Sequence, residues 1–259
     1  MNPIKAKASE GVPAIGSWVG LASDTGAEMM GRLAFDYLLL DAQHGAVTWE
    51  NMVRVLQGVA ITGTPALVRI GWNDPAMIMR ALDLGAVGVV VPMVSTPEEA
   101  ARAAAATRYP PVGTRSFGPL RNAAAPDQAN DVVLCLPMIE TAQSVGHLEA
   151  IIATPGVDGV FVGPIDLALS FGHPPDFTRF HPGVVEVIDE AVRVCHEHGK
   201  LAGTVSLHPA GAEDMLSRGI DFLTVGSDSG YVVQGARRDL ELVKAWLEAN
   251  KGASSASSR

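Results

Sequence analysis

Two carboxylates stand at positions in this 259-residue sequence where they could bind a metal ion together. Glu140 and Asp166 each follow a short apolar run and are 26 residues apart, the length of one strand–helix repeat. Ionised carboxylates on neighbouring strands would repel each other and lose hydration. A divalent cation relieves both effects, and two oxygen ligands suit Mg²⁺ or Mn²⁺, which keep other positions for water and substrate. The alternative is a structural ion pair between Glu140 and an arginine such as Arg69.

A possible general base lies in residues 35–47, FDYLLLDAQHGAV, where Asp41 ends an apolar run and His44 follows three residues later. A carboxylate beside Nδ1 would fix the imidazole tautomer and leave Nε2 free as a base. The same spacing fits a histidine in a turn that bonds to the backbone. Arg69 ends another apolar run, where its guanidinium could bind a carboxylate or an enolate oxygen. A salt bridge to Glu140 or Asp41 is its structural alternative.

The lysines argue against one class of carbonyl chemistry. None of them lies at the carboxyl end of an apolar run, and Lys200 precedes such a run. Schiff-base catalysis at these ends is therefore disfavoured. An enzyme that acts here on carbonyl compounds would need a metal as its electron sink.

Eight apolar runs alternate with helical patterns along the chain. The predicted strands are residues 14–19, 36–41, 66–70, 88–92, 134–140, 158–163, 201–205 and 222–226. Their continuous apolarity indicates burial on both faces, as in a parallel sheet covered by helices. Helix starts are readable, as at Thr96-Pro97 with Glu99. Eight such units without a Gly-rich first turn predict a single-domain TIM (β/α)₈ barrel.

In a TIM barrel, the carboxyl ends of all strands meet at one face, where catalysis takes place. We therefore expect Asp41, His44, Arg69, Glu140 and Asp166 to share that face. The long stretch 108–131 is interpreted as a functional loop. The segment 225–230, VGSDSG, is interpreted as turn chemistry, with an anion cradle as the alternative.

Composition narrows the partners and the location of the protein. The net charge is −9 and no Lys/Arg cluster stands out, which disfavours nucleic-acid and membrane partners. The first ten residues, MNPIKAKASE, lack the apolar core of a signal peptide. Cys135 and Cys195 are expected to be reduced thiols in a cytoplasmic protein. We expect one domain over residues 1–250, followed by a disordered tail over 251–259.

Seven stretches resemble the HpcH/HpaI aldolase family in order and spacing. They are LLLDAQHG, LVRI, LDLGAVGVVVPMVSTPEEA, YPPVGTRSFGP, PMIET, GVDGVFVGPIDLALSFG and TVGSD, within residues 12 to 240. The resemblance implies a metal-dependent class II aldolase on a TIM barrel. Such an enzyme would cleave 4-hydroxy-2-oxo acids to pyruvate, or a related 2-oxo acid, and an aldehyde, with Mg²⁺, Mn²⁺ or Co²⁺. It also implies a homohexamer, a dimer of trimers with partly exchanged C-terminal helices.

The resemblance assigns roles to individual residues. Glu140 and Asp166 would bind the metal, His44 would be the general base oriented by Asp41, and Arg69 would hold pyruvate and its enolate. Asp83 would be presented to the site of a neighbouring subunit. The remaining substrate contacts would come from the segment Gly163, Pro164, Ile165 and Asp166, from Gln43, and from Trp18, which with the 108–131 loop would shape the aldehyde pocket.

Two departures from the family concern substrate preference. Gln43 stands where many members have Glu, and Met138 stands where some have Gln. Two other functions remain open. One is a CoA-ester lyase of the citrate-lyase β-subunit type, which would need a basic path for the nucleotide. The other is a non-catalytic barrel that binds a keto acid or a metal.

Overall fold

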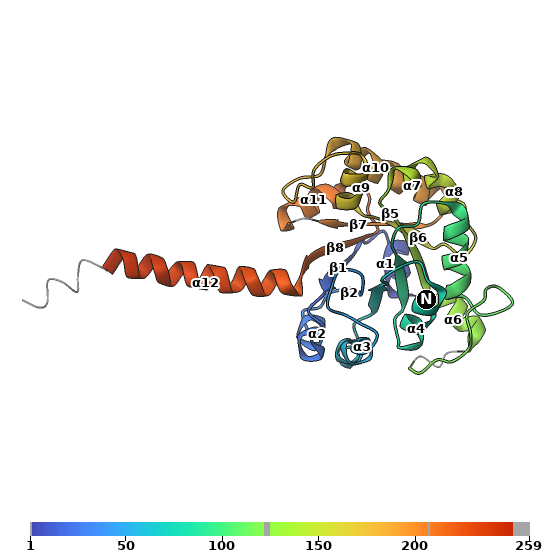
Figure 1. Ribbon diagram of the computed structural model, residues 1–259, viewed down its shortest axis with the longest axis horizontal. Helices are drawn as coiled ribbons and strands as arrows, with labels where there is room; N and C mark the ends of the chain where they lie inside the picture. Colours follow the sequence, from blue (N-terminus) through green and yellow to red (C-terminus); the bar gives the residue numbers. More distant parts are fainter. Residues whose placement is uncertain (1, 122–124, 207, 251–259) are drawn as a thin grey trace, which may run out of the picture.

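The computed structural model describes residues 2–121, 125–206 and 208–250 of a closed barrel of eight parallel strands (Figure 1). The strands pair in chain order, and β8 closes against β1. They are β1 (Ala14–Val19), β2 (Tyr37–Asp41), β3 (Ala66–Arg69), β4 (Gly88–Val91), β5 (Leu134–Ile139), β6 (Gly159–Val162), β7 (Leu201–Ser206) and β8 (Phe222–Ser227). All eight predicted strands and the TIM-barrel prediction are confirmed.

The helices that lie between two strands in the chain surround the barrel, whereas the first helix precedes β1 and the last follows β8. They are α1 (Pro3–Ser9), α2 (Asp24–Gly31), α3 (Met52–Ile61), α4 (Pro75–Asp83), α5 (Pro97–Thr107), α6 (Pro126–Val132), α7 (Ala142–Gly146), α8 (Leu148–Ala153), α9 (Pro164–Ser170), α10 (Pro182–Glu197), α11 (Pro209–Ser217) and α12 (Asp228–Asn250). Thr96 caps α5 as expected, because its side chain accepts the backbone N–H of Glu99. Proline at the first position starts α5 and several other helices without losing a hydrogen bond.

Alternation along the strands separates two apolar layers and decides which side chains reach the catalytic end. On β2, Leu38 and Leu40 pack towards the helices, while Tyr37 and Leu39 fill the barrel interior. Side chains two residues apart share a face of a strand. Asp41 therefore continues the inward row of β2 at its carboxyl end.

The same inward row explains the other polar strand ends. Leu67 on β3 and Met138 on β5 belong to the barrel interior. The residues two positions further along are Arg69 and Glu140, and Trp18 packs against the interior cluster from β1. The fold therefore brings residues from three separate strands to one inward-facing rim with Asp41.

The opposite end of the barrel is closed by α1. Asn2 donates to the carbonyls of Val87 and Val132, and Lys5 pairs with Asp158 at the start of β6. The described parts of the 108–131 stretch, residues 108–121 and 125–131, also lie at this end, since they follow α5, and Asn130 bonds to the backbone of Tyr109. The prediction that this stretch shapes the aldehyde pocket is therefore wrong for a pocket built within one chain.

The last helix, α12, leaves the barrel and projects from it (Figure 1). Apolar side chains along it are largely exposed, including Leu242, Val243, Trp246 and Leu247. Across the described parts of the chain, no helix has the length and apolarity needed to cross a membrane. The predicted disordered tail, 251–259, lies outside the described residues.

Asp158 supplies a test of how the amino end is stabilised. Its carboxylate accepts from Lys5, from the buried Arg108 at 2.6 Å and from the backbone of Cys135. Asp158→Asn leaves the Arg108 guanidinium without a counter-charge, and breaking such a buried pair costs about 3 kcal/mol. We expect the free energy of unfolding in urea to fall by about this amount. Glu190→Gln, which breaks an exposed pair with Arg193, is the control. Equal effects of the two substitutions would contradict this account.

Candidate active site

Asp41 and Arg69 form a two-point ion pair at the carboxyl end of the barrel. They are direct register partners on β2 and β3. Arg69 Nε lies 2.9 Å from Asp41 Oδ1, and Nη2 lies 2.7 Å from Oδ2. Both side chains are 12% exposed. Of the partners considered for Arg69 from the sequence, Asp41 is the one that the structure shows.

The Asp41 carboxylate also holds the loop that carries His44. Oδ1 accepts the backbone N–H groups of Gln43 and His44, each at 3.1 Å. Burial opposes ionisation of Asp41, but the hydrogen bonds and charge of Arg69 and these two N–H groups outweigh it and lower its pKa. The predicted contact between Asp41 and the His44 ring is wrong, because the carboxylate contacts the His44 backbone. The exposed imidazole has no hydrogen-bond partner among the described residues.

Trp18 fixes the other side of the Arg69 guanidinium. The Cζ atom of Arg69 lies 4.4 Å from the Trp18 ring centroid, and Trp18 meets Phe161 edge-on at 6.0 Å. A cation over an indole face is an attractive arrangement. With Nε and Nη2 on Asp41, the Nη1 hydrogens have no acceptor among the described residues. Arg69 is thus held on two sides and can still donate to a ligand.

Glu140 is a buried carboxylate with little compensation for its charge. It is 2% exposed, and its Oε1 accepts the backbone N–H of Met93 at 2.6 Å. Burial, and then the nearby charge of Asp166, outweigh this bond and the charge of Arg69 and raise the pKa of Glu140 to about 7. A Cβ atom on Gly163 would lie 2.7 Å from Glu140 Oε2. The end of β5 and the start of α9 are therefore in close contact.

This acid pair fits a divalent cation. Asp166 lies in the first turn of α9 and is exposed, and its charge acts on Glu140. A cation between the carboxylates would remove the repulsion and the desolvation cost that raise the Glu140 pKa. Within the described ranges, no group of three or more His, Cys, Asp or Glu side chains could hold a metal. The pair would therefore supply two ligands and leave the other positions open, as Mg²⁺ sites do.

Gln43 and Asp83, two further predicted site residues, lie at opposite ends of the barrel. The Gln43 side-chain oxygen is buried and has no hydrogen-bond partner among the described residues. Asp83 ends α4 at the opposite end of the barrel, where it accepts from Arg115 Nη2 at 2.7 Å. Asp83 is therefore not part of the site of its own chain.

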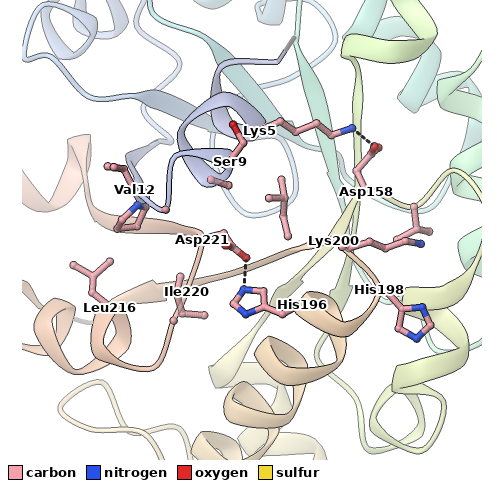
Figure 2. Close-up of a pocket in the computed structure, with 17 residues that line it drawn as sticks. Lys5, Ser9, Val12, Asp158, His196, His198, Lys200, Leu216, Ile220 and Asp221 are labelled. Atoms are coloured by element: carbon pink, nitrogen blue, oxygen red, sulfur yellow. Dashed lines mark hydrogen bonds and ion pairs between the residues drawn. The ribbon is translucent and has the colours of Figure 1, made fainter.

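A cavity with a volume of about 870 Å³ lies away from this face, beneath α1 at the amino end of the barrel (Figure 2). Its charged groups bond to one another or to the backbone: Lys5 to Asp158, His196 to Asp221, and Lys200 to the carbonyl of Ile152. These contacts give the polar groups of the cavity a structural role. The candidate site is therefore the carboxyl end of the barrel, where TIM-barrel enzymes place catalysis.

Comparison with known proteins decides the family. Residues 14–235 match the family described as HpcH/HpaI aldolase/citrate lyase. The chain belongs to this family. It is 37% identical to a 2-dehydro-3,6-dideoxy-6-sulfogluconate aldolase of Pseudomonas putida, with 89% of this chain and 92% of the relative covered. It is 36% identical to a 4-hydroxy-2-oxo-heptane-1,7-dioate aldolase of Salmonella dublin, with 99% and 98% covered.

A solved structure agrees with this assignment. A HpcH/HpaI aldolase/citrate lyase family protein from Burkholderia cenocepacia matches with a TM-score of 0.86 and 30% identity, covering 94% of this chain and all of that one. Membership of the HpcH/HpaI family, together with relatives that are named aldolases, identifies the protein as a carbon–carbon lyase.

Sequence reasoning did not find two contacts of this lyase site. Met93 holds Glu140 through its backbone N–H and has a positive φ of 56°, which periodicity does not reveal. Asp228 was interpreted as part of a turn, yet its buried carboxylate accepts the backbone N–H groups of Gly20 and Leu21. The signal available was an acid at the end of the eighth strand, in TVGSD.

Asp41→Asn tests the pairing with Arg69. The substitution removes a charge-assisted pair, and we expect the free energy of unfolding at pH 7 to fall by about 2 kcal/mol. Pairing lowers the folded-state pKa of Asp41. Its contribution is therefore complete above the ordinary aspartate pKa of about 4 and is lost as the pH falls through the folded-state value.

Urea unfolding of both proteins from pH 7 downwards measures this. The difference between them should shrink below about pH 4. The exposed Asp239, which pairs with its neighbour Arg238, provides the control Asp239→Asn. A difference that stays constant across the whole pH range would contradict the pairing account.

Proposed function

We propose that this lyase is a metal-dependent class II aldolase. It cleaves 4-hydroxy-2-oxo acids to pyruvate, or a related 2-oxo acid, and an aldehyde, and it catalyses the reverse addition. The observation that carries the proposal is the buried Glu140 carboxylate beside Asp166, on the same rim as an arginine with free donors. Relatives named as aldolases of hydroxy-oxo acids and sulfogluconate derivatives support the substrate class.

The proposal assigns the binding of the 2-oxo acid to the rim. Glu140 and Asp166 would hold Mg²⁺, Mn²⁺ or Co²⁺, which supplies Lewis-acid stabilisation of the developing enolate, worth several kcal/mol. The Nη1 group of Arg69 donates to the same enolate oxygen. In α9, Gly163 donates to Ile139 and Pro164 lacks an N–H. The amides of Ile165 and Asp166 are left to face the substrate carboxylate.

Cleavage of the C3–C4 bond begins at His44, the proposed general base. His44 takes the proton of the C4 hydroxyl group, the C3–C4 bond breaks, and C4 becomes the carbonyl carbon of the aldehyde. The electron pair of that bond passes to the C2–C3 enolate, which is protonated at C3 to give pyruvate. A positioned general base contributes roughly 10² to 10⁴ in rate. Gln43 would accept a hydrogen bond from the substrate, while Trp18 acts by holding Arg69.

Assembly and location complete the proposal. We propose a homohexamer, a dimer of trimers, in which α12 packs on another copy; the exposed apolar side chains of that helix support this. Asp83 would then lie near the site of a neighbouring subunit. A cytoplasmic location is supported by the two free, buried cysteines, Cys135 and Cys195.

Exchange of the pyruvate methyl protons in D₂O tests the proposal without knowledge of the aldehyde. We expect NMR to show exchange in the presence of Mg²⁺ or Mn²⁺ that EDTA abolishes. Glu140→Gln keeps the side-chain shape but removes a charged ligand, so it should lose exchange and the thermal shift that the metal produces. Exchange by Glu140→Gln without metal would refute the metal assignment. Acyl-CoA turnover without pyruvate exchange would favour a CoA-ester lyase, and binding without any exchange would favour a non-catalytic barrel.

Gly163→Ala tests the contact between β5 and α9. The added Cβ atom would lie 2.7 Å from Glu140 Oε2 and displace that carboxylate. A displacement of about 1 Å near reacting groups can cost about 100-fold in rate, which we expect for pyruvate release from a 4-hydroxy-2-oxo acid. Gly146→Ala is the matched control, since its Cβ atom would meet nothing within 4 Å. Full activity of Gly163→Ala would show that Glu140 need not stand where the structure places it.

A further inference from the structure

Asp228 joins the last strand to the first at the catalytic rim. It is the first residue of α12 and is 8% exposed. Its Oδ1 accepts the backbone N–H of Gly20 and its Oδ2 that of Leu21, each at 3.0 Å. One carboxylate thus holds two consecutive N–H groups of the loop between β1 and α2.

That loop touches the loop of His44. The Gly20 carbonyl accepts the backbone N–H of Ala46 at 2.7 Å. The two chains are so close that a Cβ atom on Gly45 would lie 3.0 Å from Gly20 Cα and 2.4 Å from the Asp41 carbonyl oxygen. The contact is therefore made backbone to backbone, without a side chain between the loops.

These contacts fix His44 from both sides. Before it, Asp41 holds the N–H groups of Gln43 and of His44 itself. After it, Ala46 is held by Gly20, which Asp228 holds in turn. Because the exposed His44 ring has no hydrogen-bond partner among the described residues, its place depends on this backbone path.

We infer that Asp228 is a positioning residue for His44 and acts through Gly20 and Ala46. The inference rests on the proposed function for the role of His44 as base, while the chain of contacts stands on the geometry. A negative charge in the first turn also favours α12 itself. Attachment of that turn does not depend on Asp228 alone, because the Tyr231 hydroxyl lies 3.1 Å from Ser17 Oγ and donates to the Val225 carbonyl.

Asp228→Asn tests the inference. The amide offers one acceptor oxygen and turns an NH₂ group towards the other N–H, so one of the two bonds is lost. We expect kcat for aldol cleavage to fall about tenfold, as for a small misplacement of a catalytic group. KM for the oxo acid and the affinity for Mn²⁺ should change less than about twofold, since Arg69, Glu140 and Asp166 are untouched.

A second measurement needs no aldolase activity. Modification of His44 by diethyl pyrocarbonate, followed by peptide mass spectrometry, reports the surroundings of the ring. We expect its rate to change about threefold in Asp228→Asn, as for a modest change in local free energy. His198, exposed at the amino end of the barrel, serves as the internal reference. Asp239→Asn removes another acid of α12, one that pairs with Arg238, and should change neither measurement.

The outcomes separate the inference from the proposed function. Asp228→Glu keeps both oxygens and the charge, so intermediate values of kcat and of the His44 rate would support positioning, and this variant decides the question if Asp228→Asn does not fold. A lower stability with kcat and the His44 rate unchanged would overturn the inference. If the parent protein has no aldolase activity, the proposed function fails, and the His44 rate still decides whether Asp228 positions the ring.

Discussion

The pairing of Asp41 with Arg69 is the interaction on which the catalytic end depends. Both side chains are only 12% exposed, so a substitution that removes either charge leaves the other nearly buried without its partner. The carboxylate binds the guanidinium through both oxygens, and one of them, Oδ1, also accepts the backbone N–H groups of Gln43 and His44. Arg69 and the loop that carries His44 therefore share Asp41 as their anchor, and a disturbance of Asp41 reaches both.

The second carboxylate of the rim, Glu140, has far less compensation for its charge than Asp41 has. Among the described residues, Glu140 receives one hydrogen bond, from the backbone N–H of Met93, and pairs with no arginine. Burial and the charge of Asp166 raise the pKa of Glu140, because little positive charge compensates its carboxylate. The hydrogen bonds and charge of Arg69 instead lower the pKa of Asp41. Arg69 thus compensates the charge of Asp41, whereas the charge of Glu140 has little compensation. This difference favours a cation beside Glu140 and Asp166 over a further internal salt bridge.

Sequence patterns predict the barrel well because its determinants are local. The eight apolar runs mark the strands, and two-residue alternation makes Asp41, Arg69 and Glu140 inward-facing. The choice of partner is not local. Whether Asp41 meets the His44 ring or Arg69 depends on the register of β2 against β3, which pairs Asp41 with Arg69. The position of the described residues of the 108–131 stretch follows from the end of the barrel at which α5 stops, and loop length alone does not predict it.

The pairing of β8 with β1, which closes the barrel, lies next to residues of the candidate site. Pairing between these strands is irregular between Gly16 and Trp18, so the backbone ladder is interrupted next to the ring that supports Arg69. Side chains of the first turn of α12 also contact this region, Tyr231 at Ser17 and Asp228 at Gly20. Trp18 lies between these two contacts in the chain. The helix that leaves the barrel is therefore anchored in the segment that carries Trp18, the residue that packs on the Arg69 guanidinium.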